Sequence, residues 1–326
     1  MLLSVVVPVY NSEESLLLLV ERLMQVLPPG RDGSGIQLGE LILVNDESAD
    51  RSWSVIQQLA AQYPWIRGAN LMRNYGQHNA LLCGIRLASH PVIVTLDDDL
   101  QNPPEEIPRL LDKLAEGYDV VYGAPQHQAH GLFRNFASWI TKLALQSAMG
   151  AQSARHVSAY RVFRTHLREA FASYTGPDVS IDVLLTWGTR KFGVVSVRND
   201  PRTIGASNYT LGKLIRHALN MMTGFSSLPL QFASLVGFVF TLFGFAMLCF
   251  VLGRYFIEGG SVPGFPFLAS AIAIFSGAQL FALGIIGEYL ARMHFRMMDR
   301  PSYAVLSSTQ TPSPDRAEQK THGANS

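Results

Sequence analysis

The sequence lacks the features by which several protein classes are recognised. Its 326 residues include only two cysteines, Cys83 and Cys249, so we expect no disulfide framework and interpret both as packing residues in a reducing compartment. The formal net charge is +1, from 26 basic and 25 acidic side chains, so no global field favours a nucleic-acid partner. The N-terminal segment has no basic region and is interrupted by Pro8, so it is not interpreted as a signal peptide.

Two common phosphate-binding loops are also absent. No G-x-G-x-x-G follows the first apolar run, and no G-x-x-x-x-G-K-[ST] occurs anywhere in the chain. Both motifs hold phosphate with backbone N–H groups. A nucleotide ligand would therefore need another counter-charge for its phosphates. Zinc is not expected either, because His127, His130 and His156 lack the spacing of zinc ligands.

Charge is nearly missing from two long stretches between residues 228 and 292. Residues 232–252 contain no charged side chain, and a second, predominantly apolar run occupies residues 266–289. About 20 apolar residues suffice to cross the hydrocarbon core, so we expect two transmembrane helices joined by a short external loop. The alternative is a buried helical hairpin in a large soluble domain. Both runs contain small residues that would permit close helix packing and a homo-oligomer: Gly237, Gly244, Gly277 and Gly284.

Basic side chains concentrate outside the two apolar runs, and only Arg254 lies between them. Those that flank the pair are Lys213, Arg216, His217, Arg292, Arg296 and Arg300. We therefore expect both termini to face the cytoplasm. The segment 209–227 is interpreted as an amphipathic interfacial helix, or alternatively as an ordinary helix packed on the domain. The tail 293–326 is expected to be cytoplasmic, and because it is polar after Tyr303 we expect it to be disordered after about residue 304.

The first 208 residues alternate β-branched runs with helical patterns. The runs predict strands at residues 4–9, 41–46, 66–71, 91–96 and 119–123. Helices are expected after Ser12, around Trp53, at residues 79–88 and at residues 104–116. Repeated strand–helix units indicate an α/β domain with a mostly parallel sheet flanked by helices. Ligands of such sheets bind at the carboxyl ends of the strands, where polar clusters occur here.

Three consecutive aspartates follow the fourth predicted strand. A period of two would place Asp97 and Asp99 on one side, with Asp98 pointing away and dispensable. Two carboxylates on one side favour a hard divalent cation, Mg²⁺ or Mn²⁺, which also takes phosphate oxygens. Gln101 offers another oxygen on the same side. The alternative is a helix N-terminal region, a role that Pro104–Glu106 already fills.

Several segments together resemble the family 2 glycosyltransferases of the GT-A fold, and among them the polyprenyl-phosphate sugar transferases. The segments are VVVPVYN, NDES, RNYGQHNA, LDDDLQNPPEEIP and EGYDVVYG, and the resemblance extends over nearly the whole chain. It implies an inverting, metal-dependent transfer of a sugar from a nucleotide-sugar, with UDP favoured, to undecaprenyl phosphate. It also implies a place in the bacterial inner membrane and a product used for cell-envelope glycan or lipid modification.

The resemblance implies a donor site built from several loops. Pro8, Tyr10 and Glu13 match the first nucleotide-contacting loop, and Asp46 matches the acidic residue that holds the base or ribose. The metal ligands around the diphosphate correspond to Asp97, Asp99 and Gln101. Substrate contacts are also expected from Arg73, Asn74 and His78, although His78 is interpreted as a capping or packing residue rather than a catalytic one.

An acceptor site is implied by residues nearer the membrane. Arg202, grouped with Asp97 and Asp99 as a catalytic residue, and Ser207 match a segment that approaches phosphates at the membrane surface. Arg134 matches a basic position near the lipid acceptor.

The sequence departs from the family pattern at several positions. Asn45 and Glu47 stand where Asp and Gly are commoner, and Asn208 replaces a usual Lys. Arg155 replaces an Asp sometimes proposed as the catalytic base. A phosphate acceptor is already an anion, since its second pKa is about 6, so no base is strictly required and Arg155 is hypothesised to position the acceptor phosphate.

Two further aspartates and two further functions remain open. Asp178 and Asp182, four residues apart on an expected helix, either assist as a base or belong to a solvated helix face or N-cap. A processive polysaccharide synthase is disfavoured because the chain has no Q-x-x-R-W motif. A non-catalytic membrane scaffold that binds the lipid carrier is disfavoured by the intact aspartates and Arg202.

Overall fold

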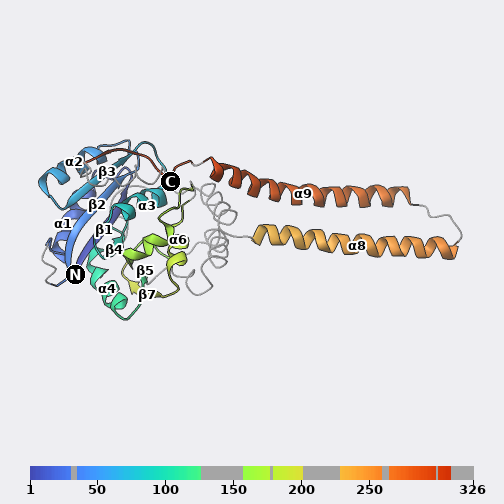
Figure 1. Ribbon diagram of the computed structural model, residues 1–326, viewed down its shortest axis with the longest axis horizontal. Helices are drawn as coiled ribbons and strands as arrows, with labels where there is room; N and C mark the ends of the chain where they lie inside the picture. The colour runs from blue at the N-terminus through green and yellow to red at the C-terminus, as the bar shows by residue number, and fades with distance from the viewer. Residues whose placement is uncertain are drawn as a thin grey trace, which may run out of the picture. The chain divides into compact units, whose positions relative to one another are not determined.

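The computed structural model divides the chain into two compact units (Figure 1). Unit 1 comprises residues 1–131, 151–209 and 301–326, and unit 2 comprises residues 132–150 and 210–300. The residues that the structure describes are 1–30, 35–125, 157–176, 179–200, 228–258, 264–298 and 300–309. The predicted interfacial helix at residues 209–227 lies outside them.

Unit 1 is built on an eight-stranded sheet with the order β7-β5-β6-β4-β1-β2-β3-β8. In chain order its strands are β1 (Leu2–Val9), β2 (Gln37–Asn45), β3 (Ile66–Leu71), β4 (Val92–Thr95), β5 (Val120–Pro125), β6 (Arg161–Arg164), β7 (Phe192–Val197) and β8 (Val305–Ser308). Strand β1 pairs in parallel with β2 and β4, β2 with β3, and β5 with β7, whereas β6 and β8 pair antiparallel with their neighbours. The mostly parallel sheet expected from the sequence is confirmed.

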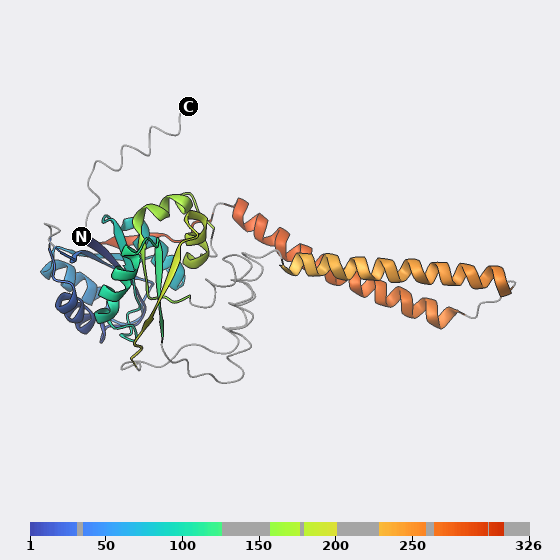
Figure 2. The same cartoon turned by 90° about the horizontal axis from the view of Figure 1, so that it is seen from below.

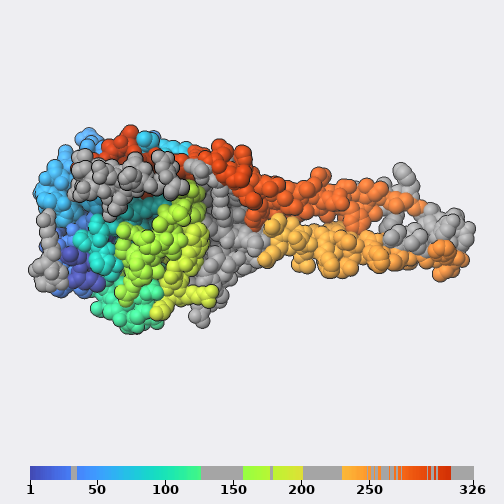
Figure 3. All heavy atoms as spheres, viewed as in Figure 1, coloured from blue at the N-terminus to red at the C-terminus, as the bar shows by residue number. Residues whose placement is uncertain are grey.

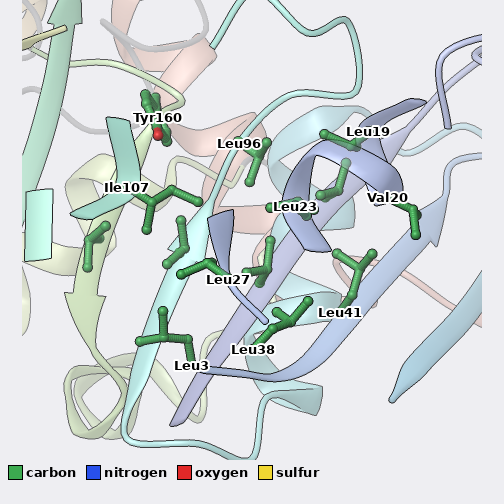
Figure 4. Packing of buried hydrophobic residues seen from close by; sticks show 14 of the residues in the cluster. Leu3, Leu19, Val20, Leu23, Leu27, Leu38, Leu41, Leu96, Ile107 and Tyr160 are labelled. Atoms are coloured by element: carbon green, nitrogen blue, oxygen red, sulfur yellow. The ribbon is translucent and has the colours of Figure 1, made fainter. Parts of the chain in front are cut away.

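Helices cover both faces of the sheet. One face packs against α1 (Leu16–Val26), α2 (Ser52–Gln62) and α4 (Ile107–Ala115). Helix α4 follows directly on the short helix η1 (Pro104–Glu106). The other face packs against α3 (Gln77–Leu87), η3 (Thr165–Phe171) and α6 (Ile181–Gly188). Figure 4 shows part of the first layer, to which α1 contributes Leu19 and Leu23 and the strands contribute Leu3 and Leu41.

The side chains of the central strands alternate between two hydrophobic layers, which explains the continuous apolar runs in these strands. Val5 and Val7 of β1 belong to the first hydrophobic layer, whereas Val6 between them belongs to the second. In β2, Leu43 faces the first layer and Ile42 the second. A strand buried on both faces is typically a near-continuous apolar run. This burial fixes the register of the central strands and therefore the positions of the loops that follow them.

The C-terminal tail completes the sheet, so the expectation of disorder after about residue 304 is wrong for residues 305–309. Strand β8 pairs antiparallel with β3, and the Thr309 N–H donates to the Gly68 carbonyl oxygen at 3.0 Å. The Gly68 N–H in turn donates to Thr309 Oγ1 at 2.8 Å. Without this segment β3 would be an edge strand with unpaired backbone groups. A polar composition therefore did not prevent the tail from ordering, because its backbone supplies the stabilising contacts.

Unit 2 contains two long apolar helices, α8 (Leu228–Glu258) and α9 (Phe265–Met297), which lie side by side (Figure 2). Each contains a segment long and apolar enough to cross a membrane, Leu230–Met247 and Ile274–Ala291. Only 6% and 0% of these two segments are buried within the structure, which disfavours a buried hairpin in a soluble core. Figure 3 shows the outward-facing side chains along both helices.

Aromatic packing joins the two helices of unit 2. The ring of Phe275 on α9 contacts Phe240 and Phe243 of α8, at centroid distances of 5.9 and 6.4 Å. A Cβ atom added at Gly244 would lie 3.1 Å from Phe275, so a glycine there lets the ring approach the helix backbone. Of the two cysteines expected to pack, Cys83 is buried in unit 1 and Cys249 is exposed on α8.

Candidate functional site

Four loops gather at the carboxyl edge of the sheet, since β4, β1, β2 and β3 are neighbours. The loops follow Val9, Asn45, Leu71 and Thr95, the last residues of these strands. Most of the predicted donor-site residues that the structure describes lie in or beside these loops. Hydrogen bonds between side chains and backbone link each loop to the next, so the edge is a connected polar surface above an apolar sheet.

The three aspartates lie in a turn and not in a strand, because β4 already ends at Thr95. The alternation expected for Asp97, Asp98 and Asp99 therefore does not apply. Asp98 is not an idle residue that points away: its Oδ2 accepts hydrogen bonds from the Tyr10 N–H at 3.1 Å and from Ser12 Oγ at 2.5 Å. Asp98 thus ties the aspartate turn to the loop after β1, and the expectation that it is dispensable has lost its basis.

The pKa of Asp98 lies above its usual value. Burial of the carboxylate is the largest cause, and the neighbouring charge of Asp99 acts in the same direction. The hydrogen bonds from Ser12 and the Tyr10 N–H lower the pKa but do not outweigh burial. Two adjacent carboxylates in a partly buried turn repel each other, and a bound cation would relieve that repulsion.

Asp97, Asp99 and Gln101 form the predicted cation-binding set. Gln77 Nε2 donates to Asp97 Oδ1 at 2.5 Å, and the Gln101 N–H donates to Asp99 Oδ1 at 3.1 Å. All three side chains are half-buried. Among the residues described, no three His, Cys, Asp or Glu side chains gather as a metal site, so this set supplies two carboxylates and an amide oxygen. Such hard oxygen donors suit Mg²⁺ or Mn²⁺, with phosphate and water filling the remaining positions.

The loops after β1 and β2 are joined by reciprocal hydrogen bonds. The Asn11 N–H donates to Ser48 Oγ at 3.0 Å, and the Ala49 N–H donates to Asn11 Oδ1 at 2.8 Å. The Arg51 N–H donates to Glu13 Oε2 at 2.8 Å. Glu13, predicted to contact the nucleotide, therefore supports the neighbouring loop in this structure. Its contact with a nucleotide stays a prediction.

Asp46 and Glu47 hold the loop after β3 by three consecutive backbone amides. Asp46 Oδ1 and Oδ2 accept from the N–H groups of Tyr75 and Gly76, at 2.7 and 2.8 Å. Glu47 Oε2 accepts from the Asn74 N–H at 2.7 Å. Burial of Asp46 raises its pKa, an effect that the two amides oppose and the Glu47 charge reinforces. Asp46 therefore shapes the loop, and its predicted contact with the base or ribose remains untested.

The other predicted donor-site residues lie close to this edge in different environments. Arg73 and Asn74 are exposed, and the Arg73 guanidinium lies over the Tyr75 ring at 4.6 Å. Pro8 is buried within β1, opposite Val44 of β2, and Tyr10 is 46% exposed. His78, on the first turn of α3, accepts the Ile181 N–H at its Nδ1 at 3.4 Å, which agrees with a packing role.

Asp182 is part of a buried ion pair. It therefore neither lies on a solvated helix face nor is available as a catalytic base. It pairs with Arg161, and the Tyr122 hydroxyl donates to its Oδ1 at 3.1 Å. Arg161 also donates through Nε to Thr95 Oγ1 at 3.1 Å, at the end of β4. The side chains of Arg161 and Asp182 are only 1% and 6% exposed. The network includes Thr95, two residues before Asp97, and it therefore supports the aspartate turn.

Sequence reasoning missed several residues that organise the site, namely Ser12, Glu47, Gln77 and Arg161. Glu47 and Gln77 lie within NDES and RNYGQHNA, two of the segments that carry the resemblance, and Arg161 is a charged residue between Tyr160 and Val162. The remaining predicted residues lie outside the described part of the chain: Arg134, Arg155, Asp178, Arg202 and Ser207.

The sequence profile of one family matches more than half of the chain. The family is described as "Glycosyl transferase family 2", and the match covers residues 4–172. The matched segment contains strands β2 to β6, all of β1 except its first two residues, and the four loops of the site. The chain belongs to glycosyltransferase family 2, and it is a glycosyltransferase with the mostly parallel, helix-flanked sheet expected from the resemblance.

Relatives with similar sequences match the chain over almost its full length. The undecaprenyl-phosphate 4-deoxy-4-formamido-L-arabinose transferase of Pectobacterium carotovorum is 35% identical over 317 residues, covering 95% of this chain and 94% of the relative. The protein of the same description from Photorhabdus laumondii is 37% identical over 305 residues, covering 93% and 92%. These matches include both long helices of unit 2.

Solved structures show a more distant similarity. The glucosyl-3-phosphoglycerate synthase of Mycobacterium tuberculosis, in complex with Mn²⁺, UDP-glucose and phosphoglyceric acid, is 18% identical and covers 68% of this chain and 77% of its own. The TM-score is 0.49.

Proposed function

We propose that this glycosyltransferase transfers a sugar from a nucleotide-sugar, UDP-linked, to undecaprenyl phosphate with inversion at the anomeric carbon. The observation that carries the proposal is the similarity to undecaprenyl-phosphate sugar transferases over 93–95% of the chain, hairpin included. The product would be a polyprenyl-phosphate-linked sugar for cell-envelope glycan or lipid modification. The UDP preference rests on the family resemblance.

A divalent cation, Mg²⁺ or Mn²⁺, would be held by Asp97, Asp99 and Gln101 and would stabilise the charge that grows on the leaving diphosphate. The protein's own contribution is to fix these ligands before the substrate arrives. Gln77 orients Asp97, and Asp98 ties the turn to the loop after β1. Such preorganisation lowers the barrier because no reorientation is needed during the reaction.

The proposed reaction is a single in-line displacement. An acceptor phosphate oxygen forms a bond to the anomeric carbon while the bond from that carbon to the diphosphate oxygen breaks, and the nucleoside diphosphate leaves with the electron pair. The acceptor is already an anion near neutral pH, so no base must remove a proton. This agrees with the structure, where Asp182 is occupied by Arg161 and Tyr122. Arg134, Arg155, Arg202 and Ser207 remain the predicted phosphate contacts.

The chain path supports a membrane topology with both termini on one side. Strand β8 follows α9 but pairs with β3 of unit 1, so the chain that leaves unit 1 before α8 returns to the same unit. A chain that returns to one side must cross the membrane an even number of times, which two spans satisfy. We propose that this side is the cytoplasmic side of the bacterial inner membrane, and the basic residues that flank the helices support this orientation.

The decisive experiment offers a panel of nucleotide-sugars to membranes that contain the full chain, undecaprenyl phosphate and Mn²⁺. We expect one donor to yield a lipid product whose mass equals that of undecaprenyl phosphate plus the sugar, with release of the nucleoside diphosphate. Asp112→Asn, at an exposed position on α4, is the matched control for carboxylate variants of the site. No product from any donor would contradict the proposal.

A further inference from the structure

We infer that Glu47 is a positioning residue that sets the affinity for the nucleotide-sugar by holding the segment Arg73–Gly76 in shape. The inference rests on the proposed function. It concerns a position at which the family more commonly has glycine, so it describes a property of this chain and not of the family pattern. Three observations carry it: the backbone of Glu47, its hydrogen bond and the path of the segment it holds.

The backbone at Glu47 adopts a conformation that favours glycine. Its φ is +56°, in the left-handed region, where a Cβ atom crowds the following carbonyl oxygen. Among the described residues that are not glycine, only Asn11 and Leu100 share a positive φ. A strained residue persists where surrounding contacts hold it, and such residues cluster at functional sites. A glycine here would satisfy the backbone, so the side chain must contribute something that glycine lacks.

The side chain supplies the hydrogen-bond acceptor for Asn74. Glu47 Oε2 accepts the Asn74 N–H at 2.7 Å, while the neighbouring Asp46 accepts the next two amides of the loop. Asp46 is buried and Glu47 is exposed. The Asp46 carboxylate therefore holds the loop on its buried side, and the Glu47 carboxylate holds it on its solvent side. Without Glu47, Asp46 would still hold Tyr75 and Gly76, and the loss would be confined to Arg73 and Asn74.

The held segment leads directly to the aspartate turn. Arg73 lies over the Tyr75 ring, so the position of its guanidinium depends on the loop backbone on both sides of Asn74. The next residue after Gly76 is Gln77, which donates to Asp97. Glu47 therefore stands at one end of a continuous series of contacts whose other end is a predicted cation ligand. Arg73, the exposed cation of this segment, is the group that a misplaced loop would move away from an anionic donor.

The test compares Glu47→Gly with Glu47→Gln in the purified full chain. Glutamine keeps an acceptor oxygen and the left-handed strain, whereas glycine removes both, and Glu21→Gln on the exposed side of α1 controls for loss of one surface carboxylate. We expect Glu47→Gly to raise KM for the nucleotide-sugar by about tenfold with kcat nearly unchanged, and Glu47→Gln to stay close to wild type. The melting temperature should be similar in all four proteins, because relief of strain offsets the lost hydrogen bond.

Amide hydrogen exchange without ligand provides an independent readout. Exchange at Asn74 should be faster in Glu47→Gly than in wild type, with Tyr75 and Gly76 still protected by Asp46. An unchanged KM in an active Glu47→Gly variant, or a Glu47→Gln variant as impaired as Glu47→Gly, would overturn the inference alone. A wild-type chain without turnover on any donor would overturn the proposed function. In that case, unchanged exchange at Asn74 in Glu47→Gly would show that Glu47 does not hold the segment Arg73–Gly76.

Discussion

The two units of this protein place the same apolar side chains in opposite surroundings. In unit 1, Phe163 is 0% exposed between the sheet and its helices, whereas Phe238 of α8 is 61% exposed. Leu43 of β2 is 0% exposed and Leu280 of α9 is 69% exposed. An extended surface of exposed aromatic and aliphatic groups is unfavourable in water, so the hairpin is built for another solvent. Both units are rich in apolar residues, but these residues are buried in unit 1 and exposed in unit 2.

Polar groups differ between the units in the complementary way. At the carboxyl edge of unit 1, carboxylates such as Asp46, Asp98 and Asp182 accept hydrogen bonds from named partners. The apolar segment Leu230–Met247 of unit 2 contains no acidic or basic residue. This difference indicates that unit 1 carries the polar groups of the proposed active site, whereas unit 2 carries the apolar helices of the proposed membrane anchor. Substitutions in one unit should therefore leave the task of the other intact, and the predictions below test this separation.

The largest effect is expected in the buried network beneath the site. Arg161→Met leaves Asp182 as an uncompensated buried charge and should lower the free energy of unfolding by about 3–5 kcal/mol. The double variant Arg161→Met/Asp182→Leu removes both charges and should recover most of that loss. Thermal melting of the full chain in detergent measures both. If the double variant were no more stable than the single one, the ion pair would not account for the destabilisation.

The second effect concerns the aspartate turn. Asp99→Asn should reduce kcat/KM by about 10²–10³-fold, because a proposed cation ligand beside the leaving diphosphate is weakened. Mn²⁺-dependent binding of UDP should weaken in parallel, and carbonate-resistant association with membranes should not change. Asp112→Asn serves as the control and should keep full activity. An Asp99→Asn variant with wild-type turnover would remove Asp99 from the site.

A charge introduced into the hairpin of α8 and α9 should weaken membrane association and leave nucleotide binding intact, which is the reverse of the outcome expected for Asp99→Asn. Phe238 lies at the middle of the Leu230–Met247 segment, and Phe238→Asp should cost about 3 kcal/mol for insertion. The fraction of protein that resists alkaline extraction from membranes should fall, while the solubilised variant still binds UDP with Mn²⁺. The same change at Leu43, in the core of unit 1, should instead abolish folding. Equal behaviour of the two variants would contradict the separation of the units.

The smallest effect is expected at the start of α2, where Asp50 accepts hydrogen bonds from Ser52 N–H and Oγ and from the Glu13 N–H. Burial opposes ionisation of Asp50, but these hydrogen bonds outweigh it, and its pKa is lowered. A lowered folded pKa stabilises the native state above the unfolded pKa, and this stabilisation is lost as pH falls through the folded pKa.

Asp50→Ala should therefore lower the free energy of unfolding by about 1 kcal/mol at neutral pH. The difference from wild type should shrink as pH falls below about 4. Melting curves recorded from pH 7 downward measure it, with Asp112→Ala as the control. A difference that grows toward acid pH would show that the carboxylate does not act in its ionised form.

Most of the fold follows from apolar runs whose meaning is local. The strand predicted at residues 66–71 coincides with β3, and the helix predicted at 79–88 lies within two residues of α3. Strands β6, β7 and β8 were not predicted, and each of them pairs with a segment far away in the sequence. Their formation depends on unsatisfied backbone groups of β4, β5 and β3, which no local pattern reveals.

The sequence predicted the residue types at the site better than it predicted the contacts among them. The residue types at the strand ends indicated where polar groups gather, because parallel strands end at one edge. The roles of Asp98 and Glu47 required geometry: the first depends on where β4 stops, and the second on a positive φ. Asp182 shows the same limit, since an i, i+4 spacing cannot reveal a partner 21 residues away in Arg161.

The position of β8 also fixes the order in which the protein is completed during synthesis. The first seven strands are translated before α8, but the strand that covers β3 leaves the ribosome only after both helices of unit 2. Until then the edge of β3 offers unpaired backbone groups to any other chain. In the proposed topology, a chain that crossed the membrane only once between β7 and β8 would leave β8 and β3 on opposite sides. Closure of the sheet is therefore incompatible with an odd number of crossings by the segment that contains α8 and α9.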